Sequence, residues 1–207
     1  MIRMSVEIYN RVLSQKGINH LLNFLHKKDR YYQEGQFVRK QGFEWGKNDW
    51  PHQIVTGILK KVGVKSNPYS IMMIDLDHQL GIHTDTLLED RCDKNIIVPL
   101  EISEPAATVI FKNKWYGKSM NLNYTNKHFT SIGHNNPFDK NTYEKYLKNF
   151  DYNLLSGFEI EKIYNWDVGS VCVFDSQHLH TNAYISKYKK AMYIWTIHND
   201  KPTTNET

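Results

Sequence analysis

Residues 169–180 read GSVCVFDSQHLH, and this stretch decides the fold that we expect. The apolar run from Ser170 to Asp175 has the composition of a buried strand, and turn residues (DVG, 167–169) precede it. Two histidines, His178 and His180, follow at alternate positions, so that both lie on the same side of a continuing strand. The segment therefore predicts a strand that presents imidazole groups on one face.

A second pattern of metal-ligating residues lies upstream at residues 81–85, which read GIHTD. If a strand ends here, the His83 imidazole and the Asp85 carboxylate project to the same side, because side chains alternate along a strand. Two such groups can hold adjacent positions on one metal ion. A third imidazole would complete the two-histidine, one-carboxylate facial triad of non-haem iron(II) oxygenases, which leaves room on the metal for a bidentate keto acid and dioxygen.

A basic strand follows the histidines, since residues 187–195 read KYKKAMYIW. Lys189 is nine residues after His180, and Trp195 is six residues after Lys189. Together with Phe174 and Ser176, this spacing resembles the 2-oxoglutarate/Fe(II)-dependent dioxygenase superfamily, and its prolyl hydroxylase branch most closely. The resemblance covers residues 69–112 and 167–197, a little over a third of the chain.

The resemblance implies a hydroxylase that consumes 2-oxoglutarate and dioxygen and releases succinate and CO2. His83, Asp85 and His180 would bind Fe(II), and Lys189 would pair with the distal carboxylate of 2-oxoglutarate through a charge-assisted contact. In related halogenases a small residue replaces the carboxylate, so the presence of Asp85 favours hydroxylation or another oxidation. The substrate, a small molecule or a protein side chain, is not identified by these residues.

His178 competes with His180 for the role of third ligand, because His178 to Lys187 is also nine residues. The Phe-x-Ser spacing before His180 and the interval from Lys189 to Trp195 both favour His180. Lys190, ten residues after His180, competes with Lys189, which the position of Trp195 favours. The remaining histidines are expected in loops or on the surface, among them His78, His128, His134 and His198.

The order of predicted elements is typical of a mostly β protein with N-terminal helices. Helices are expected at residues 5–28, with a break near Gly17, and from Trp50 to Val62, with Asp49 as its cap and Gly63 at its end. A further short helix is expected at residues 142–150. Strands are expected at residues 70–76, 94–102, 107–112, 157–164, 170–175 and 189–197.

This order predicts a single domain with a double-stranded β-helix, or jelly roll, and helices packed on one outer face. Residues 1–68 would be mainly helical support, residues 69–112 and 157–197 the jelly-roll core, and residues 113–156 an insertion. The insertion is either a substrate lid or a variable surface excursion, and Trp115 and Tyr116 are its first candidates for substrate contact. Strand alternation puts Lys189, Ala191, Tyr193 and Trp195 on one face.

The composition limits the function classes. A chain of 207 residues with 40% hydrophobic residues can bury a substantial core, and its formal charge of +4 is too small to indicate nucleic-acid binding. We find no apolar stretch suited to a signal peptide or a membrane span. Cys92 and Cys172 have the spacing of neither a zinc site nor a disulfide framework, so we expect a soluble cytoplasmic protein.

Two other functions are compatible with parts of the pattern. Nucleic-acid demethylases of the same superfamily carry an Arg-x-Asn-x-Thr-x-Arg element that residues 189–195 lack. A jelly-roll metal-binding protein or a metal-dependent isomerase without oxygenase activity would share the fold, because jelly rolls carry unrelated functions. Turnover of 2-oxoglutarate distinguishes these classes, since neither a binding protein nor an isomerase would decarboxylate it.

Overall fold

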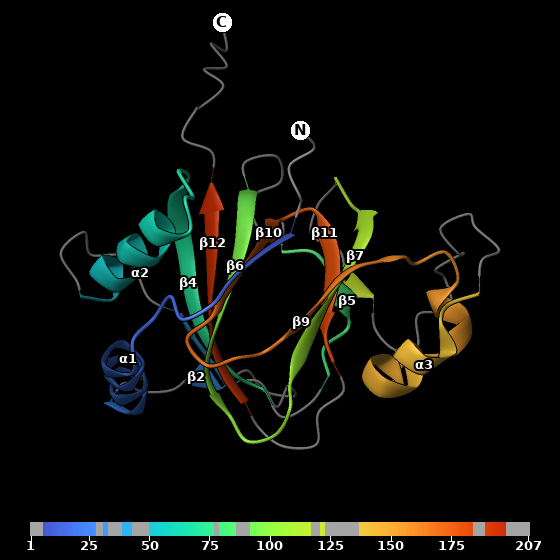
Figure 1. Ribbon diagram of the computed structural model, residues 1–207, viewed down its shortest axis with the longest axis horizontal. Coiled ribbons are helices and arrows are strands. Elements are labelled where there is room, and N and C mark those ends of the chain that lie inside the picture. The colour runs from blue at the N-terminus through green and yellow to red at the C-terminus, as the bar shows by residue number, and fades with distance from the viewer. Residues whose placement is uncertain are drawn as a thin grey trace, which may run out of the picture.

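The structure is a computed structural model, and it describes residues 6–27, 31–32, 39–42, 50–76, 79–85, 92–116, 121–122, 137–183 and 189–197. Two antiparallel β-sheets face each other in the middle of the molecule, between α1 and α2 on one side and α3 on the other (Figure 1). The predicted fold class, a mostly β double-stranded β-helix, is confirmed.

The larger sheet has seven strands and the smaller has five. The larger sheet follows the order β1 (Val6–Tyr9), β10 (Val171–Asp175), β6 (Cys92–Ile102), β12 (Lys189–Ile197), β4 (Asn67–Leu76), β3 (Arg39–Gly42) and β2 (Tyr31–Tyr32). The smaller sheet follows the order β8 (Asn121–Leu122), β5 (Ile82–His83), β11 (His178–Asn182), β7 (Ala107–Lys114) and β9 (Ile160–Asn165). The chain passes from one sheet to the other between β4 and β5, between β5 and β6, and between β6 and β7. It crosses again between β9 and β10, between β10 and β11, and between β11 and β12, which is the winding of a jelly roll.

The space between the sheets is filled by inward-facing side chains from both of them. Ala191, Tyr193 and Trp195 of β12 lie in this interior cluster, which confirms the predicted row for these three residues. Phe174 is fully buried beside them. The remaining buried members of the cluster are Val6, Ile97, Ala106, Ile110, Tyr164, Trp166 and Cys172.

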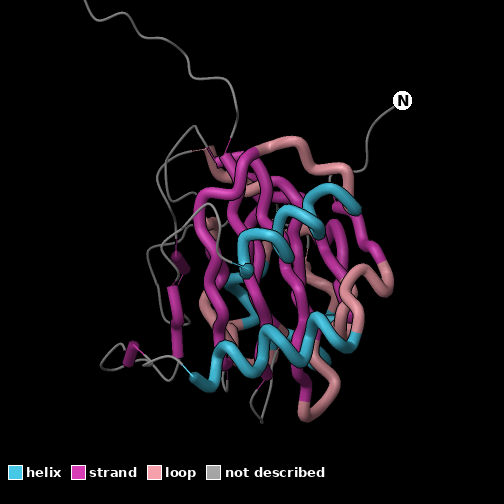
Figure 2. The backbone as a smooth tube through the Cα atoms, turned by 90° about the vertical axis from the view of Figure 1, so that its left-hand side faces the viewer, coloured by secondary structure: helices cyan, strands magenta, loops and turns pink. Residues whose placement is uncertain are grey.

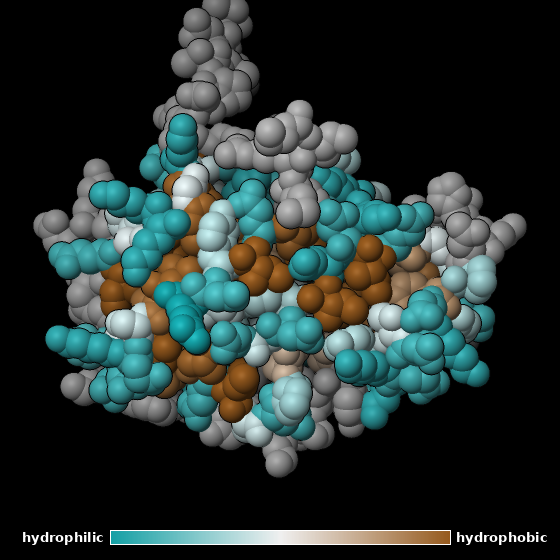
Figure 3. Space-filling view, in the orientation of Figure 1, coloured by the Kyte–Doolittle hydropathy of each residue, from teal (hydrophilic) through white to brown (hydrophobic). Residues whose placement is uncertain are grey.

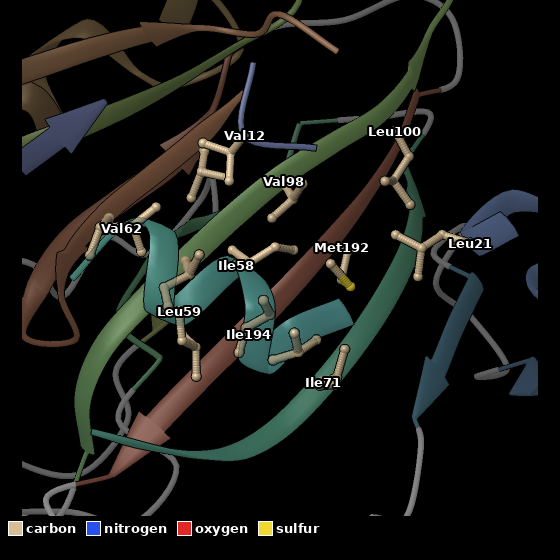
Figure 4. Packing of buried hydrophobic residues seen from close by; sticks show 14 residues of the cluster. Val12, Leu21, Ile58, Leu59, Val62, Ile71, Val98, Leu100, Met192 and Ile194 are labelled. Carbon is tan, nitrogen blue, oxygen red and sulfur yellow. The ribbon is translucent and has the colours of Figure 1, made fainter. Parts of the chain in front are cut away.

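The outer face of the larger sheet is covered by α1 (Gln15–Lys27) and α2 (Trp50–Lys61), which run across its strands (Figure 2). Ile58 and Leu59 of α2 are buried against Met192 and Ile194, the outward-facing residues of β12 (Figure 4). Complete burial of an aliphatic side chain contributes roughly 1.5–3 kcal/mol. Gly63, with φ of 71°, follows α2 in the left-handed conformation, as predicted for the end of this helix.

The outer face of the smaller sheet is covered by residues 137–156, the larger described part of the insertion. This part contains α3 (Lys140–Thr142), a π-helical turn η2 (Tyr143–Leu147) and a 3-10 turn η3 (Tyr152–Leu155). Leu147, Phe150 and Leu155 are buried there against Phe111 and Leu179 of the sheet. Helices and helical turns therefore lie on the outer faces of both sheets, and the prediction that they pack on one outer face is wrong. The apolar residues on the outer face of the smaller sheet are buried by the insertion. Whether the insertion also serves as a lid stays a prediction.

The predicted helix at residues 5–28 is wrong in its first part. Val6–Tyr9 forms the edge strand β1, with Val6 opposite Phe174 of β10, and Gly17 lies inside α1 and not at a break. Pairing with β10 buries Val6 in the interior cluster, and this tertiary contact overrides the helical spacing of the apolar residues. The predicted cap Asp49 lies outside the described residues.

The conformation of the turn that precedes β10 depends on Gly169. Its φ is 80°, and a Cβ at this position would lie 2.7 Å from the carbonyl oxygen of Leu13. The Gly169 carbonyl accepts a hydrogen bond from the amide of Leu13 at 3.0 Å, which ties the turn to the segment before α1. Glycine is needed here because any side chain would collide with that segment.

The surface that faces the viewer in Figure 1 is mixed in character. Hydrophobic residues show in its middle, over the strands, and hydrophilic residues dominate the end at which α3 lies (Figure 3). Among the described residues, no helix is both long and apolar enough to cross a membrane.

Candidate metal centre

His83 and His180 lie directly opposite each other on the paired strands β5 and β11. Their ring centroids are 4.4 Å apart, and the Phe174 ring packs edge-on against His180 at 5.0 Å. His180 is 2% exposed and His83 is half-buried. Residues that are distant in the sequence are thus brought together by the ladder of the smaller sheet.

Asp85 follows β5 by two residues and completes the group. Its Oδ1 lies 3.5 Å from Nε2 of His83, and its Oδ2 lies 3.2 Å from Nε2 of His180. One possible ligand atom from each of the three residues lies within 4.8 Å of the others. Among the described residues, only these three form a group of histidine, cysteine, aspartate or glutamate side chains that could hold a metal ion.

The orientation of both imidazoles is fixed by backbone carbonyls. His83 Nδ1 is 2.7 Å from the Gly81 oxygen, and His180 Nδ1 is 3.1 Å from the His178 oxygen. A carbonyl oxygen only accepts, so each Nδ1 carries the hydrogen and each Nε2 presents its lone pair to the centre. Nε2 of His180 is buried and has no hydrogen-bond partner among the described residues, as expected for a nitrogen that binds a metal.

The electrostatics of the group favour an ionised carboxylate. Burial would raise the pKa of Asp85, but the favourable electrostatic interaction with the neighbouring His180 and His83 side chains, together with the nearby Trp195 side chain, outweighs burial. The pKa of Asp85 therefore lies well below its usual range. An anionic carboxylate beside two imidazole nitrogens is the donor set of a divalent metal site.

Two side chains of the larger sheet reach across to Asp85. Asn95 Nδ2 of β6 donates to Asp85 Oδ2 at 3.2 Å, and the Trp195 side chain of β12 lies near enough to this carboxylate to lower its pKa. Sequence reasoning missed Asn95. No local pattern distinguishes it from Asp93 and Lys94, the other polar residues at the start of β6.

The loop before His83 is fixed on two sides. Gln79 Nε2 donates to the carbonyl of Asn182 in β11 at 3.0 Å and to the carbonyl of Tyr146 in the insertion at 2.9 Å. The Leu80 amide donates to Asn182 Oδ1 at 2.6 Å. The insertion therefore contacts Gln79, in the segment that precedes His83.

His178, the alternative third ligand, lies outside the group. Its Nδ1 is 2.6 Å from the Phe111 carbonyl oxygen, and its Nε2 is 3.9 Å from Asp175 Oδ2. The pairing of β11 with β7 shifts register between His178 and His180, so the two side chains do not follow a regular alternation. The structure brings His180, and not His178, to His83 and Asp85.

Lys189 and Lys190 begin β12, where Lys189 is opposite Leu76 of β4 and Ile102 of β6. The Lys190 side chain donates to Glu101 at 2.6 Å, and its row is that of the outward-facing Met192. The Lys189 side chain lies outside the described part of the structure. The other predicted positions outside it are Lys187, His78, His128, His134 and His198.

Trp115 and Tyr116 follow β7 and are 42% and 79% exposed. The Trp115 amide donates to the Gln177 carbonyl at 2.8 Å, next to the turn between β10 and β11. Their contact with a substrate stays a prediction.

Comparisons with known proteins give similar folds but no similar sequences. No protein-family model matches the chain, and no curated protein matches it. The carbocyclase SnoK, described as non-haem and α-ketoglutarate dependent, from nogalamycin biosynthesis, is 14% identical over 95% of this chain and 81% of its own, with a TM-score of 0.59. A Pseudomonas putida prolyl-4-hydroxylase is 8% identical over 96% of this chain and 95% of its own, with a TM-score of 0.55.

A prolyl hydroxylase from Trichoplax adhaerens, solved with a peptide fragment of hypoxia inducible factor, is 9% identical over 94% of this chain and 84% of its own, with a TM-score of 0.52. At such low identity the likeness concerns the fold. The chain therefore has the double-stranded β-helix fold that these 2-oxoglutarate oxygenases and hydroxylases share.

Proposed function

We propose that the protein is an Fe(II)- and 2-oxoglutarate-dependent oxygenase that hydroxylates its substrate. The observation that carries the proposal is the group formed by His83, Asp85 and His180, with both Nε2 atoms directed at the carboxylate. The fold shared with the solved oxygenases supports it.

The residues of the group fit ferrous iron. Two neutral imidazole nitrogens and one carboxylate are the ligand set of the facial triad, and three coordination positions then stay open. The backbone carbonyls of Gly81 and His178 hold the tautomer that a metal needs, in the way that outer partners orient ligating histidines. The buried Nε2 of His180 has no hydrogen-bond partner among the described residues, which supports a ligand at this position.

Lys189 is the residue that we propose for the distal carboxylate of 2-oxoglutarate. Its position in β12 belongs to the same row as Ala191, Tyr193 and Trp195, which line the interior between the sheets. The alternative, Lys190, is engaged with Glu101 and belongs to the opposite row. A lysine at the start of β12 would fix the keto acid by a charge-assisted hydrogen bond.

Iron with bound 2-oxoglutarate would supply oxidation by dioxygen, with decarboxylation of the keto acid to succinate and CO2. The chain would hold and orient the reactants and keep water away from them. Phe174 and Trp195 are 0% and 5% exposed, so the interior side of the centre is closed to solvent. The presence of Asp85 supports hydroxylation, and the substrate would be a small molecule or a protein side chain.

The test is consumption of 2-oxoglutarate by the iron-loaded protein in air, with succinate measured by NMR and oxygen uptake by electrode. We expect slow uncoupled turnover without substrate, which is absent in Asp85→Ala and retained in His178→Gln. If the iron-loaded protein forms no succinate with any of a panel of peptides and small molecules, the proposal is wrong. A metal-dependent isomerase or a binding jelly roll would then account for the site.

A further inference from the structure

Asp85 stands beyond the end of β5, so the ladder of the smaller sheet does not fix its carboxylate. The backbone pairing of β5 with β11 ends at His83, opposite His180. Contacts from outside the smaller sheet must therefore orient the third member of the group.

Asn95 makes such a contact from the facing sheet. It lies in β6 between Phe174 of β10 and Trp195 of β12, and it is 2% exposed. Its Nδ2 donates to Asp85 Oδ2 at 3.2 Å, the same oxygen that lies 3.2 Å from Nε2 of His180.

The other end of the Asn95 amide lacks a hydrogen-bond partner in the part of the chain that the structure describes. Its Oδ1 is buried and accepts no hydrogen bond from the described residues. Two other asparagines of the sheets behave differently: Asn182 accepts from Leu80 and donates to Ala183, while Asn113 accepts from Glu159 and donates to Gly157. Those two bind backbone at both ends. A buried amide that leaves its acceptor unused is unfavourable for folding. Gln79 also leaves its Oε1 without a hydrogen-bond partner among the described residues, but its Nε2 binds backbone carbonyls, whereas the Nδ2 of Asn95 binds a carboxylate of the metal group.

From these contacts we infer that Asn95 is a positioning residue of the metal centre, whose side-chain amide holds the Asp85 carboxylate in the orientation that binds the metal. The inference rests on the proposed function. With Oδ2 tied to the amide, rotation of the carboxylate is restricted before the metal arrives. The Oδ1 of Asn95 lies in the same buried site and would be available to a hydrogen-bond donor bound there.

The experiment is anaerobic titration of the full chain with Fe(II) alone and, separately, with Co(II) alone, for which the visible ligand-field spectrum is recorded at saturation. Asn95→Leu keeps the branching and the number of heavy atoms and removes the donor. Asn95→Asp keeps the shape and places a second carboxyl group against Asp85. We expect both to weaken metal binding by about 10- to 100-fold, the range for loss of a partner of a metal ligand, and to change the Co(II) spectrum.

Asn113→Leu is the matched control, because it removes two hydrogen bonds of a half-buried asparagine in β7. It should lower the melting temperature and leave the Co(II) affinity and spectrum unchanged. If both Asn95 variants bind Co(II) with wild-type affinity and spectrum, the inference is wrong while the proposed function stands. If the wild type binds neither metal, both are wrong. Asn95→Asp keeps the test informative should Asn95→Leu fail to fold.

Discussion

His83 and His180 face each other across one antiparallel pair, and their rings stand 4.4 Å apart at centroid. The β5–β11 ladder thus sets the spacing of the two imidazoles, and the carbonyls of Gly81 and His178 set their rotation. The facing sheet also contacts the group: Asn95 donates a hydrogen bond to Asp85, and the Phe174 ring packs against His180. The centre therefore spans both sheets, so its geometry depends on how they pack.

The histidines at 178 and 180 make a matched pair for a first prediction. His180→Gln should abolish measurable Fe(II) binding, with a loss larger than the roughly 10- to 100-fold that follows loss of an outer-shell partner. His178→Gln should leave affinity almost unchanged, because its Nδ1 contacts Phe111 and its ring lies outside the group. Isothermal titration under anaerobic conditions measures both. Equal losses of Fe(II) affinity in the two variants would contradict the assignment of His180 as the third metal ligand.

The two lysines that begin β12 make a second pair. Lys189→Ala should raise the dissociation constant for 2-oxoglutarate by about 10- to 100-fold, because charge-assisted hydrogen bonds contribute roughly 1.5–3 kcal/mol. Lys190→Ala should leave that constant unchanged and cost at most about 1 kcal/mol of stability, since its partner Glu101 is partly exposed. Titration of the iron-loaded protein with 2-oxoglutarate gives both constants. A larger effect at Lys190 would reverse their roles.

Two glycines test the fold apart from the centre. Gly169→Ala should lower the free energy of unfolding by about 2 kcal/mol or more, because the left-handed conformation costs other residues roughly 1–2 kcal/mol and the new Cβ would meet the Leu13 carbonyl. Gly57→Ala in α2 should raise it by roughly 0.5–1 kcal/mol, since no atom lies within 4 Å of a Cβ there. Urea denaturation measures both free energies. A Gly169→Ala variant as stable as the wild type would contradict the left-handed conformation and close contact described for this turn.

Stability should also fall in alkaline solution. Burial raises the pKa of the Cys172 thiol and of the Tyr164 phenol above their ordinary values of 9.0 and 10.0. Each group stays neutral in the folded protein at a pH where the unfolded chain ionises, so its contribution is complete below the ordinary pKa and is lost as the pH rises past it. The free energy of unfolding should decline above about pH 9, by roughly 1.4 kcal/mol per pH unit for each group.

Cys172→Ala separates the contribution of the thiol. Urea denaturation at several pH values should give a shallower decline between about pH 9 and 10 in this variant, because Cys172 has the lower ordinary pKa of the two groups, 9.0 against 10.0 for Tyr164. The comparison uses the slope, so a general loss of stability from the smaller side chain does not disturb it. Identical slopes in wild type and variant would show that the thiol does not contribute.

Much of the fold could be predicted because local patterns and tertiary structure agree. The strands around Val171 and Ala191, the helix that begins at Trp50 and the turn at Gly169 all follow from apolar patterning and turn residues. Val6–Tyr9 could not be predicted, since its strand form depends on pairing with β10. The helical cover of the smaller sheet also escaped prediction, because spacing alone does not say which face a helix covers.

The same distinction between local patterns and tertiary contacts applies to the metal centre. His83 and Asp85 are close in the sequence, so alternation along a strand suggested their shared direction. His180 could be preferred over His178 only by spacing, and the register shift of β11 separates the two in space. Asn95 could not be found, because its contact with Asp85 joins the two sheets and no local pattern encodes how they pack.

The most direct test of the proposed function is anaerobic addition of 2-oxoglutarate to the Fe(II)-loaded protein, with the visible spectrum recorded. We expect a weak metal-to-ligand charge-transfer band that requires both iron and 2-oxoglutarate, is retained in His178→Gln and is lost in His180→Gln. Bound iron that gives no such band on saturation with 2-oxoglutarate would contradict the keto-acid site and leave a metal-binding jelly roll of another function.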